Sequence, residues 1–164
     1  MAIVNNVTRL LDSHKIEYFQ YELPAEKLGA MKTAGLLGVD ESIVFKTIVV
    51  TREKSKKPIL VVLPGNRVVD LKLVASTFGE KKVTLPSERE AETITGLQAG
   101  GISPLALINK RFSVVIDVIA QNFAEIHISG GQRGLNIKLG VDDLAKLTMA
   151  KFAPISTQIP GSAK

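Results

Sequence analysis

Lys46 is the first residue whose position suggests chemistry. It lies in SIVFKTIVV, residues 42–50, a β-branched stretch of strand length. Because side chains alternate along a strand, Lys46 shares its face with apolar residues such as Val44 and Ile48. A lysine held there is partly desolvated, which disfavours its charge unless an anion is supplied. Lys46 is therefore a candidate anion-binding residue; the alternative is a lysine that extends from a strand end to water.

Two glycine-rich stretches are further candidates. Gly100–Pro104 reads GGISP, and glycine lets a backbone approach a ligand closely, so exposed N–H groups there could hold an anion or a developing oxyanion. Ser129–Gly134 reads SGGQRG and carries Arg133, whose guanidinium could pair with phosphate. The alternative is a plain turn in each case. Each signal is weak by itself, but the three occur together in one small basic domain.

Several kinds of catalytic machinery are excluded by composition. The chain has no cysteine, so it can have neither a disulfide nor a cysteine nucleophile. Its two histidines, His14 and His127, are too few for an ordinary zinc site. The glycine patterns of nucleotide-binding Rossmann and P-loop folds are absent. We therefore expect no metal and no cofactor.

The elements that must position these residues form a single α/β domain. Helices are predicted near residues 6–13, 25–37, 71–78 and 88–95, and a last helix is capped by Asp142 or Asp143. Strands are predicted at 42–50, 59–63, 112–120, 124–130 and 135–140. Without a strict βαβ rhythm, this order predicts a mixed, curved central β-sheet flanked by helices. We expect the domain to span residues 1–155 and a flexible C-terminal tail to span 156–164.

Net charge and hydropathy indicate the surroundings. The net charge of +5 favours a polyanionic partner, although ordinary solubility explains it nearly as well. No apolar run approaches the ~20 residues that span a bilayer, and the N-terminus lacks the pattern of a secretory signal. We expect a cytoplasmic protein that binds no membrane.

The motifs together resemble a known family. The order FKT, then TG…GGISP, a strand ending in VID, SGGQRG and finally DDL is similar to the YbaK and prolyl-tRNA-synthetase-associated editing family. Members are aminoacyl-tRNA deacylases that clear mischarged tRNA. The resemblance extends from about Tyr21 to Ile155 and implies the same fold.

The resemblance also implies roles for particular residues. Lys46, Gly100 and Gly101 would be catalytic, with the lysine anchoring the tRNA 3′ end and the glycine backbone lying against the aminoacyl ester. The residues implied in substrate binding are Tyr21, Phe45, Thr47, Ile102, Ser103, Pro104, Ser129, Gly130 and Arg133. The sequence departs from the family pattern at Leu23, where histidine is expected, and at Asn136, where aspartate is expected.

The activity implied is trans-editing of Cys-tRNA(Pro), in which the substrate thiol would attack its own ester, with release of a cyclic thiolactone as one route. The expected partners are mischarged tRNA, through its acceptor 3′ end, and prolyl-tRNA synthetase in a ternary complex; DNA is not expected. Two alternatives stay open. One is deacylation of another mischarged tRNA such as Ala-tRNA(Pro), and the other is a non-catalytic tRNA-binding or regulatory module.

Overall fold

The structure is a computed structural model that describes residues 2–53 and 56–160. Its helices are α1 (Asn6–Ser13), α2 (Gly29–Leu37), α3 (Leu71–Thr77), α4 (Glu88–Thr95) and α5 (Val141–Thr148). Its strands are β1 (Tyr18–Glu22), β2 (Phe45–Val50), β3 (Ile59–Pro64), β4 (Arg67–Val69), β5 (Ser113–Asp117), β6 (Glu125–Ser129), β7 (Leu135–Gly140), β8 (Lys151–Ala153) and β9 (Ser156–Gln158). Short 3-10 helices occupy Glu41–Ile43, Pro104–Ala106, Ile108–Lys110 and Val118–Asn122. None of the described helices is long and apolar enough to cross a membrane.

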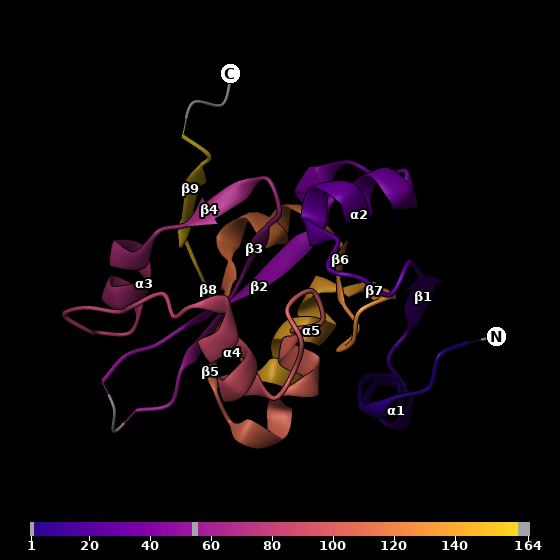
Figure 1. Ribbon diagram of the computed structural model, residues 1–164, viewed down its shortest axis with the longest axis horizontal. Coiled ribbons are helices and arrows are strands. Elements are labelled where there is room, and N and C mark those ends of the chain that lie inside the picture. Colours follow the sequence, from indigo (N-terminus) through magenta and orange to yellow (C-terminus); the bar gives the residue numbers. More distant parts are fainter. Residues whose placement is uncertain (1, 54–55, 161–164) are drawn as a thin grey trace.

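The mixed α/β class is confirmed, although the strands divide among three sheets. One sheet has the order β2-β3-β5-β8, with β2 antiparallel to β3 and the other pairs parallel. A second, antiparallel sheet has the order β1-β7-β6, and a single bridge from Val44 to His127 connects it to the first. The third pairs β4 with β9. Figure 1 shows β4 and β9 at the upper left and the sheet of β1, β6 and β7 at the right.

The core has two parts because β2 and β3 are covered on both faces. Alternate residues such as Phe45, Val49 and Leu60 pack in the larger cluster, together with α1, α5 and the inner face of β6 and β7. The intervening residues, among them Val50 and Val61, pack in a smaller cluster with α3. Side-chain alternation along the strands thus assigns each residue to one cluster or the other.

Helix starts follow their caps in most places. Asn5 caps α1, Asp70 caps α3, and Ser87 with Glu90 forms a capping box at the start of α4. The prediction that Asp142 or Asp143 caps the last helix is wrong, because Gly140 is its N-cap and both aspartates lie in the first turn. In that turn their negative charges still interact favourably with the positive end of the helix dipole.

Two further predicted boundaries are corrected. Helix α2 begins at Gly29 rather than near residue 25, since its N-cap Leu28 offers no side-chain oxygen to start it earlier. The strand predicted over 112–120 ends at Asp117, where the carboxylate accepts a hydrogen bond from the Ile119 N–H at 3.0 Å and starts a 3-10 turn.

The loose tail predicted from residue 156 is also corrected. Ser156–Gln158 form β9, and Ser156 is buried with its hydroxyl bonded to the buried carboxylate of Asp117. Arg67 donates its Nε–H to the same hydroxyl at 2.7 Å. A buried polar group needs such partners, so this cluster holds the segment against β4 and β5. Residues 161–164 of the expected tail lie outside the described residues.

Candidate active site

A cavity of about 550 Å³ lies along the outer edge of β2. Its walls come from the loop before α2 and the first turns of that helix, the start of α4, the loop around residue 100, the end of β6 and the start of β7. The lining residues used below are Lys27, Phe45, Lys46, Thr47, Val49, Gly100, Ile102, Ser129 and Asn136. The volume suits a small organic ligand, and most of the lining is apolar.

Lys46 has the character predicted for it. Burial lowers the pKa of its ammonium, because desolvation penalises the charged form. Its Nζ donates to the carbonyl oxygen of Gly65 at 3.3 Å, and none of the described carboxylates forms an ion pair with it. The two carboxylates in the cavity lining, Glu26 and Glu88, are paired with Lys32 and Lys27. Lys46 can therefore accept an anionic partner.

The loop Gly100–Pro104 faces the cavity with only part of its length. Gly100 and Ile102 line the cavity, and the described chain offers no acceptor for the N–H of either residue. The N–H of Gly101 is already donated to the carbonyl of Gln98 at 2.8 Å. Two backbone donors, two residues apart, thus belong to the cavity wall without a partner in the described chain, and donors of this kind could hold an oxyanion.

Residue 101 is a glycine for a reason that the sequence did not reveal. A Cβ placed on it would lie 2.9 Å from the Cα of Gln132 and 3.0 Å from the backbone nitrogen of Arg133. The backbone that comes close to this glycine is that of the second glycine-rich turn. Gly101 is itself buried and does not line the cavity. Its catalytic role stays a prediction, but packing already explains the absence of a side chain.

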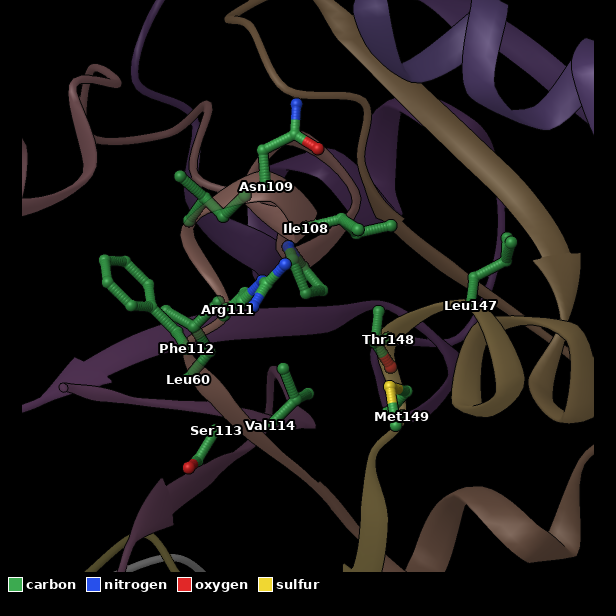
Figure 2. A pocket seen from close by; sticks show the side chains of 12 residues that line it. Leu60, Ile108, Asn109, Arg111, Phe112, Ser113, Val114, Leu147, Thr148 and Met149 are labelled. Atoms are coloured by element: carbon green, nitrogen blue, oxygen red, sulfur yellow. The ribbon is translucent and has the colours of Figure 1, made fainter.

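Ser103 and Pro104 lie away from the cavity. Ser103 is fully buried, and its hydroxyl accepts the N–H of Leu105 at 3.2 Å, so it caps the 3-10 helix that follows. Pro104 lines a different pocket, of about 640 Å³, between β3, β5 and the end of α5. Figure 2 shows that pocket, with Arg111 and Met149 among its labelled residues. Of the binding residues predicted in the GGISP stretch, Ile102 thus lines the first cavity, Pro104 lines the second pocket and Ser103 lies in the core.

The turn Ser129–Gly134 holds the loop in place. Arg133 donates its Nε–H to the carbonyl of Ala99 at 2.7 Å, so one of its guanidinium donors is used within the protein. Arg133 is not among the residues that line the cavity. Gly130 packs against Leu135, which would meet a Cβ there at 2.4 Å. Ser129 does line the cavity, and its hydroxyl accepts the N–H of Gly131 at 3.2 Å.

The remaining predicted residues divide in the same way. Thr47 and Phe45 line the cavity, although Phe45 is only 3% exposed and belongs mainly to the core. Tyr21 is outside the lining, and its ring lies against His127 with centroids 5.4 Å apart. His14 is a surface residue at the end of α1.

Asn136, where the family pattern has aspartate, belongs to a buried polar pair. Its Oδ1 lies 2.8 Å from Nδ1 of His127, and because a carbonyl oxygen only accepts, that ring nitrogen carries the hydrogen. Burial is the main cause that lowers the pKa of His127, while the hydrogen bond that its ring donates to Asn136 acts in the opposite direction. Burial therefore favours the neutral ring of the histidine. Among the described residues, no cluster of three or more His, Asp or Glu side chains could hold a metal ion.

The sequence missed a second wall of the cavity. Leu28 and Ala30, at the start of α2, supply apolar surface. Leu85, before α4, and Ala91, within α4, supply more. Leu85 is 51% exposed and lies just before the capped start of α4. Its position before Pro86 and the capping residue Ser87 was the only feature of the sequence that could have indicated this wall.

Fold and cavity together define an α/β protein whose cavity has the size for a small ligand and is lined by a desolvated lysine and by loop residues with free N–H groups. The chain belongs to the aminoacyl-tRNA editing domain family, whose model matches residues 25–147. The family resemblance found in the motifs is thereby confirmed.

Individual relatives agree with that membership. A protein of Enterococcus faecalis, provisionally named Cys-tRNA(Pro)/Cys-tRNA(Cys) deacylase EbsC, is 35% identical over 155 residues, which cover 93% of each chain. The crystal structure of a hypothetical protein superposes with a TM-score of 0.84 at 24% identity, covering 93% of this chain and all of that one. Another, described provisionally as a trans-editing enzyme for prolyl tRNA synthetase, has a TM-score of 0.78 at 21% identity and covers 95% and 99%. At these identities the two structures show the shared fold.

Proposed function

We propose that the protein is a trans-acting deacylase that hydrolyses cysteine mischarged on tRNA(Pro). Family membership and the named relative support aminoacyl-tRNA deacylation as the activity. One observation carries the assignment to this cavity. The desolvated Lys46 lines it together with Gly100 and Ile102, whose N–H groups are free. Lys46 would hold the phosphate of the tRNA 3′ end, and the two N–H groups would hold the ester carbonyl as it becomes an oxyanion.

The thiol of the substrate would supply the nucleophile. Its sulfur attacks the ester carbonyl carbon, the carbon–oxygen bond to the ribose breaks, and the thiol proton ends on the released ribose hydroxyl. The resulting four-membered thiolactone is then opened by water to give cysteine. Intramolecular attack replaces an activated water, provided that the protein holds the geometry.

The charges of the cavity favour this route over water activation. Deacylation of Ala-tRNA(Pro) has no substrate thiol and needs a general base within reach of a water molecule. Both carboxylates in the lining, Glu26 and Glu88, are already ion-paired. The neutral ring of His127 lies outside the lining. We therefore expect cysteinyl esters to be cleaved much faster than alanyl esters.

Release of labelled cysteine from Cys-tRNA(Pro) tests the proposal. We expect release by the parent and a loss of about 100-fold or more in Lys46→Ala, the size typical of removing one preorganised electrostatic contact in an active site. Lys72→Ala is the matched control, because Lys72 is an exposed lysine on α3, far from the cavity lining. Equal rates for Lys46→Ala and Lys72→Ala would overturn the role of Lys46.

The substrate series separates the remaining readings. Cys-tRNA(Pro), Cys-tRNA(Cys) and Ala-tRNA(Pro) should be assayed with and without added prolyl-tRNA synthetase. If the synthetase restricts release to tRNA(Pro), a ternary complex supplies the tRNA selectivity. Salt-sensitive binding of tRNA without any turnover would instead indicate a non-catalytic tRNA-binding module.

A further inference from the structure

Basic residues from four separate segments of the sequence meet at one end of the sheet β2-β3-β5-β8. The register places Val50 at the end of β2 opposite Ile59 at the start of β3, and Ile59 opposite Ser113 at the start of β5. Strand β8 begins at the same end with Lys151, which lies opposite Val115 of β5. We call this surface the basic end. Its cations among the described residues are Arg52, Lys56, Lys57, Lys81, Lys82, Lys110, Arg111 and Lys151.

Direct contacts hold these segments together. Nζ of Lys57 donates to the carbonyl oxygen of Lys110 at 2.6 Å, which joins the loop after β2 to the segment before β5. The carboxylate of Glu80 lies 2.7 Å from Nζ of Lys56 and 3.5 Å from the guanidinium of Arg52, which joins the same loop to the one after α3. The two exposed lysines that follow Glu80 in the sequence therefore belong to the same surface.

An aromatic ring adds the fourth segment. The centroid of the Phe78 ring lies 4.8 Å from Nζ of Lys151 and 5.6 Å from Cζ of Arg52. A cation over an aromatic face is attracted by the quadrupole of the ring. Phe78 thus keeps a cation from β8 and a cation from the loop after β2 close together.

Little negative charge offsets these cations. The described residues of the four segments include two carboxylates, those of Glu53 and Glu80, and the Glu80 side chain is 3% exposed and paired with two cations. The eight cations exceed the two carboxylates by six, whereas the whole chain has a net charge of +5, so the rest of the molecule is nearly neutral. The exposed lysines of the basic end that form no ion pair with a described carboxylate are Lys57, Lys81, Lys82, Lys110 and Lys151.

The basic end adjoins the cavity. Thr51 and Thr84 exchange two backbone hydrogen bonds, each of 2.8 Å, in an antiparallel bridge. On one side of this bridge, Val49 and Leu85 line the cavity. On the other side, both segments continue directly into the basic end, and Figure 1 shows the loop after β2 extending to the lower left. A ligand that fills the cavity and extends past the bridge therefore reaches the unpaired lysines.

A polyanion whose end enters the cavity fits this arrangement. We propose that the basic end binds phosphates of the tRNA acceptor stem while the aminoacylated 3′ end lies in the cavity. This inference rests on the proposed function. Contacts between lysine and phosphate release condensed counterions, so the affinity that they supply falls as the salt concentration rises. They read no bases, so acceptor stems of different sequence would bind alike.

An acidic surface of a partner protein is the competing occupant. Two observations favour RNA. Protein–protein interfaces are depleted in lysine, whereas exposed lysines dominate the basic end. The basic end also lies next to the cavity, and the RNA that brings the ester into the cavity carries a phosphate at every nucleotide.

The test separates the acceptor stem from the 3′ end. One probe is an RNA hairpin with the acceptor stem of tRNA(Pro) and a CCA end, to which cysteine is joined through a stable amide. The second probe is the trinucleotide CCA with the same cysteine amide and no stem. Lys82→Gln/Lys110→Gln removes one exposed cation from each of two segments. Arg9→Gln/Lys15→Gln is the matched control, because it removes the same charge at exposed positions in and just after α1.

Binding of both probes is measured over a range of salt concentrations. Each lost contact between lysine and phosphate lowers the slope of log affinity against log salt by about one unit. For the hairpin, we expect Lys82→Gln/Lys110→Gln to lower this slope by about one to two units and to weaken binding roughly tenfold or more at about 0.1 M salt. Its affinity for the trinucleotide should equal that of the parent, whereas Lys46→Ala should weaken the binding of both probes.

The outcomes separate this inference from the proposed function. Equal hairpin binding by the two double variants would overturn the inference, because net charge would then explain the whole effect. Unchanged hairpin binding with a lost response to prolyl-tRNA synthetase would also overturn it and assign the basic end to that protein. Either result leaves the deacylase intact if cysteine is released from Cys-tRNA(Pro). Conversely, the expected hairpin results in a protein that releases no cysteine retain the tRNA surface and reject the deacylase.

Discussion

The two glycine-rich stretches have similar compositions but different positions relative to the cavity. Gly100–Pro104 contributes Gly100 and Ile102 to the cavity wall, whereas the middle of Ser129–Gly134 packs behind that wall. In the first stretch, Gly100 and Ile102 have N–H groups without a partner in the described chain. In the second, the backbone of Gln132 and Arg133 packs against Gly101, and the Arg133 side chain bonds to Ala99 beside the first stretch. A run of glycines can therefore mark either a surface for a ligand or a surface for another backbone.

Gly101 offers the largest test of that difference. Gly101→Val introduces a side chain where the backbone of Gln132 and Arg133 leaves no room, and overpacking of this kind typically costs about 1–3 kcal/mol. We expect this loss of stability in urea unfolding, together with reduced deacylation. Gly35→Ala is the matched control, because nothing lies within 4 Å of a Cβ there and alanine favours the helix. A Gly101→Val protein as stable as the parent would mean that the two stretches can separate at no cost.

Arg133 gives an intermediate effect. Arg133→Gln removes the hydrogen bond from Nε to the carbonyl of Ala99, which sits next to Gly100. We expect about 1 kcal/mol of lost stability and a several-fold lower rate of cysteine release, since a hydrogen bond to a charged group is worth about that or slightly more. Arg9→Gln, which changes an exposed arginine of α1, should leave both quantities unchanged. If Arg133→Gln kept the parent rate, the turn would not position the loop for catalysis.

The smallest effect is expected in the pH dependence of stability. It concerns the hairpin of β6 and β7, which contains Ser129–Gly134. Burial lowers the pKa of His127 in the folded protein, whereas in the unfolded chain it titrates near 6.5. As the pH falls below that value, the unfolded chain takes up a proton that the folded chain does not, so stability decreases until the pH passes the folded pKa. His127→Gln should flatten this part of a thermal unfolding profile. His14→Gln, at a surface position, should not; an equal flattening in both would contradict the assignment.

Local chemistry in the sequence determined much of the fold. The capping residues Asn5, Asp70 and Ser87 start helices where they were expected, because a side-chain oxygen needs only neighbouring N–H groups to act as a cap. The motif order was sufficient for the family. The alternation around Lys46 likewise predicted a partly desolvated lysine, since burial on one face of a strand follows from its period of two.

Only the tertiary structure decided which candidate residues share a cavity. Ser103 and Arg133 look available in the sequence, but each uses its polar group within the protein, with Leu105 and with Ala99. The contact of Arg133 with Ala99 joins residues 34 positions apart in the chain, and no local pattern specifies whether a backbone or a ligand will fill the space beside a glycine.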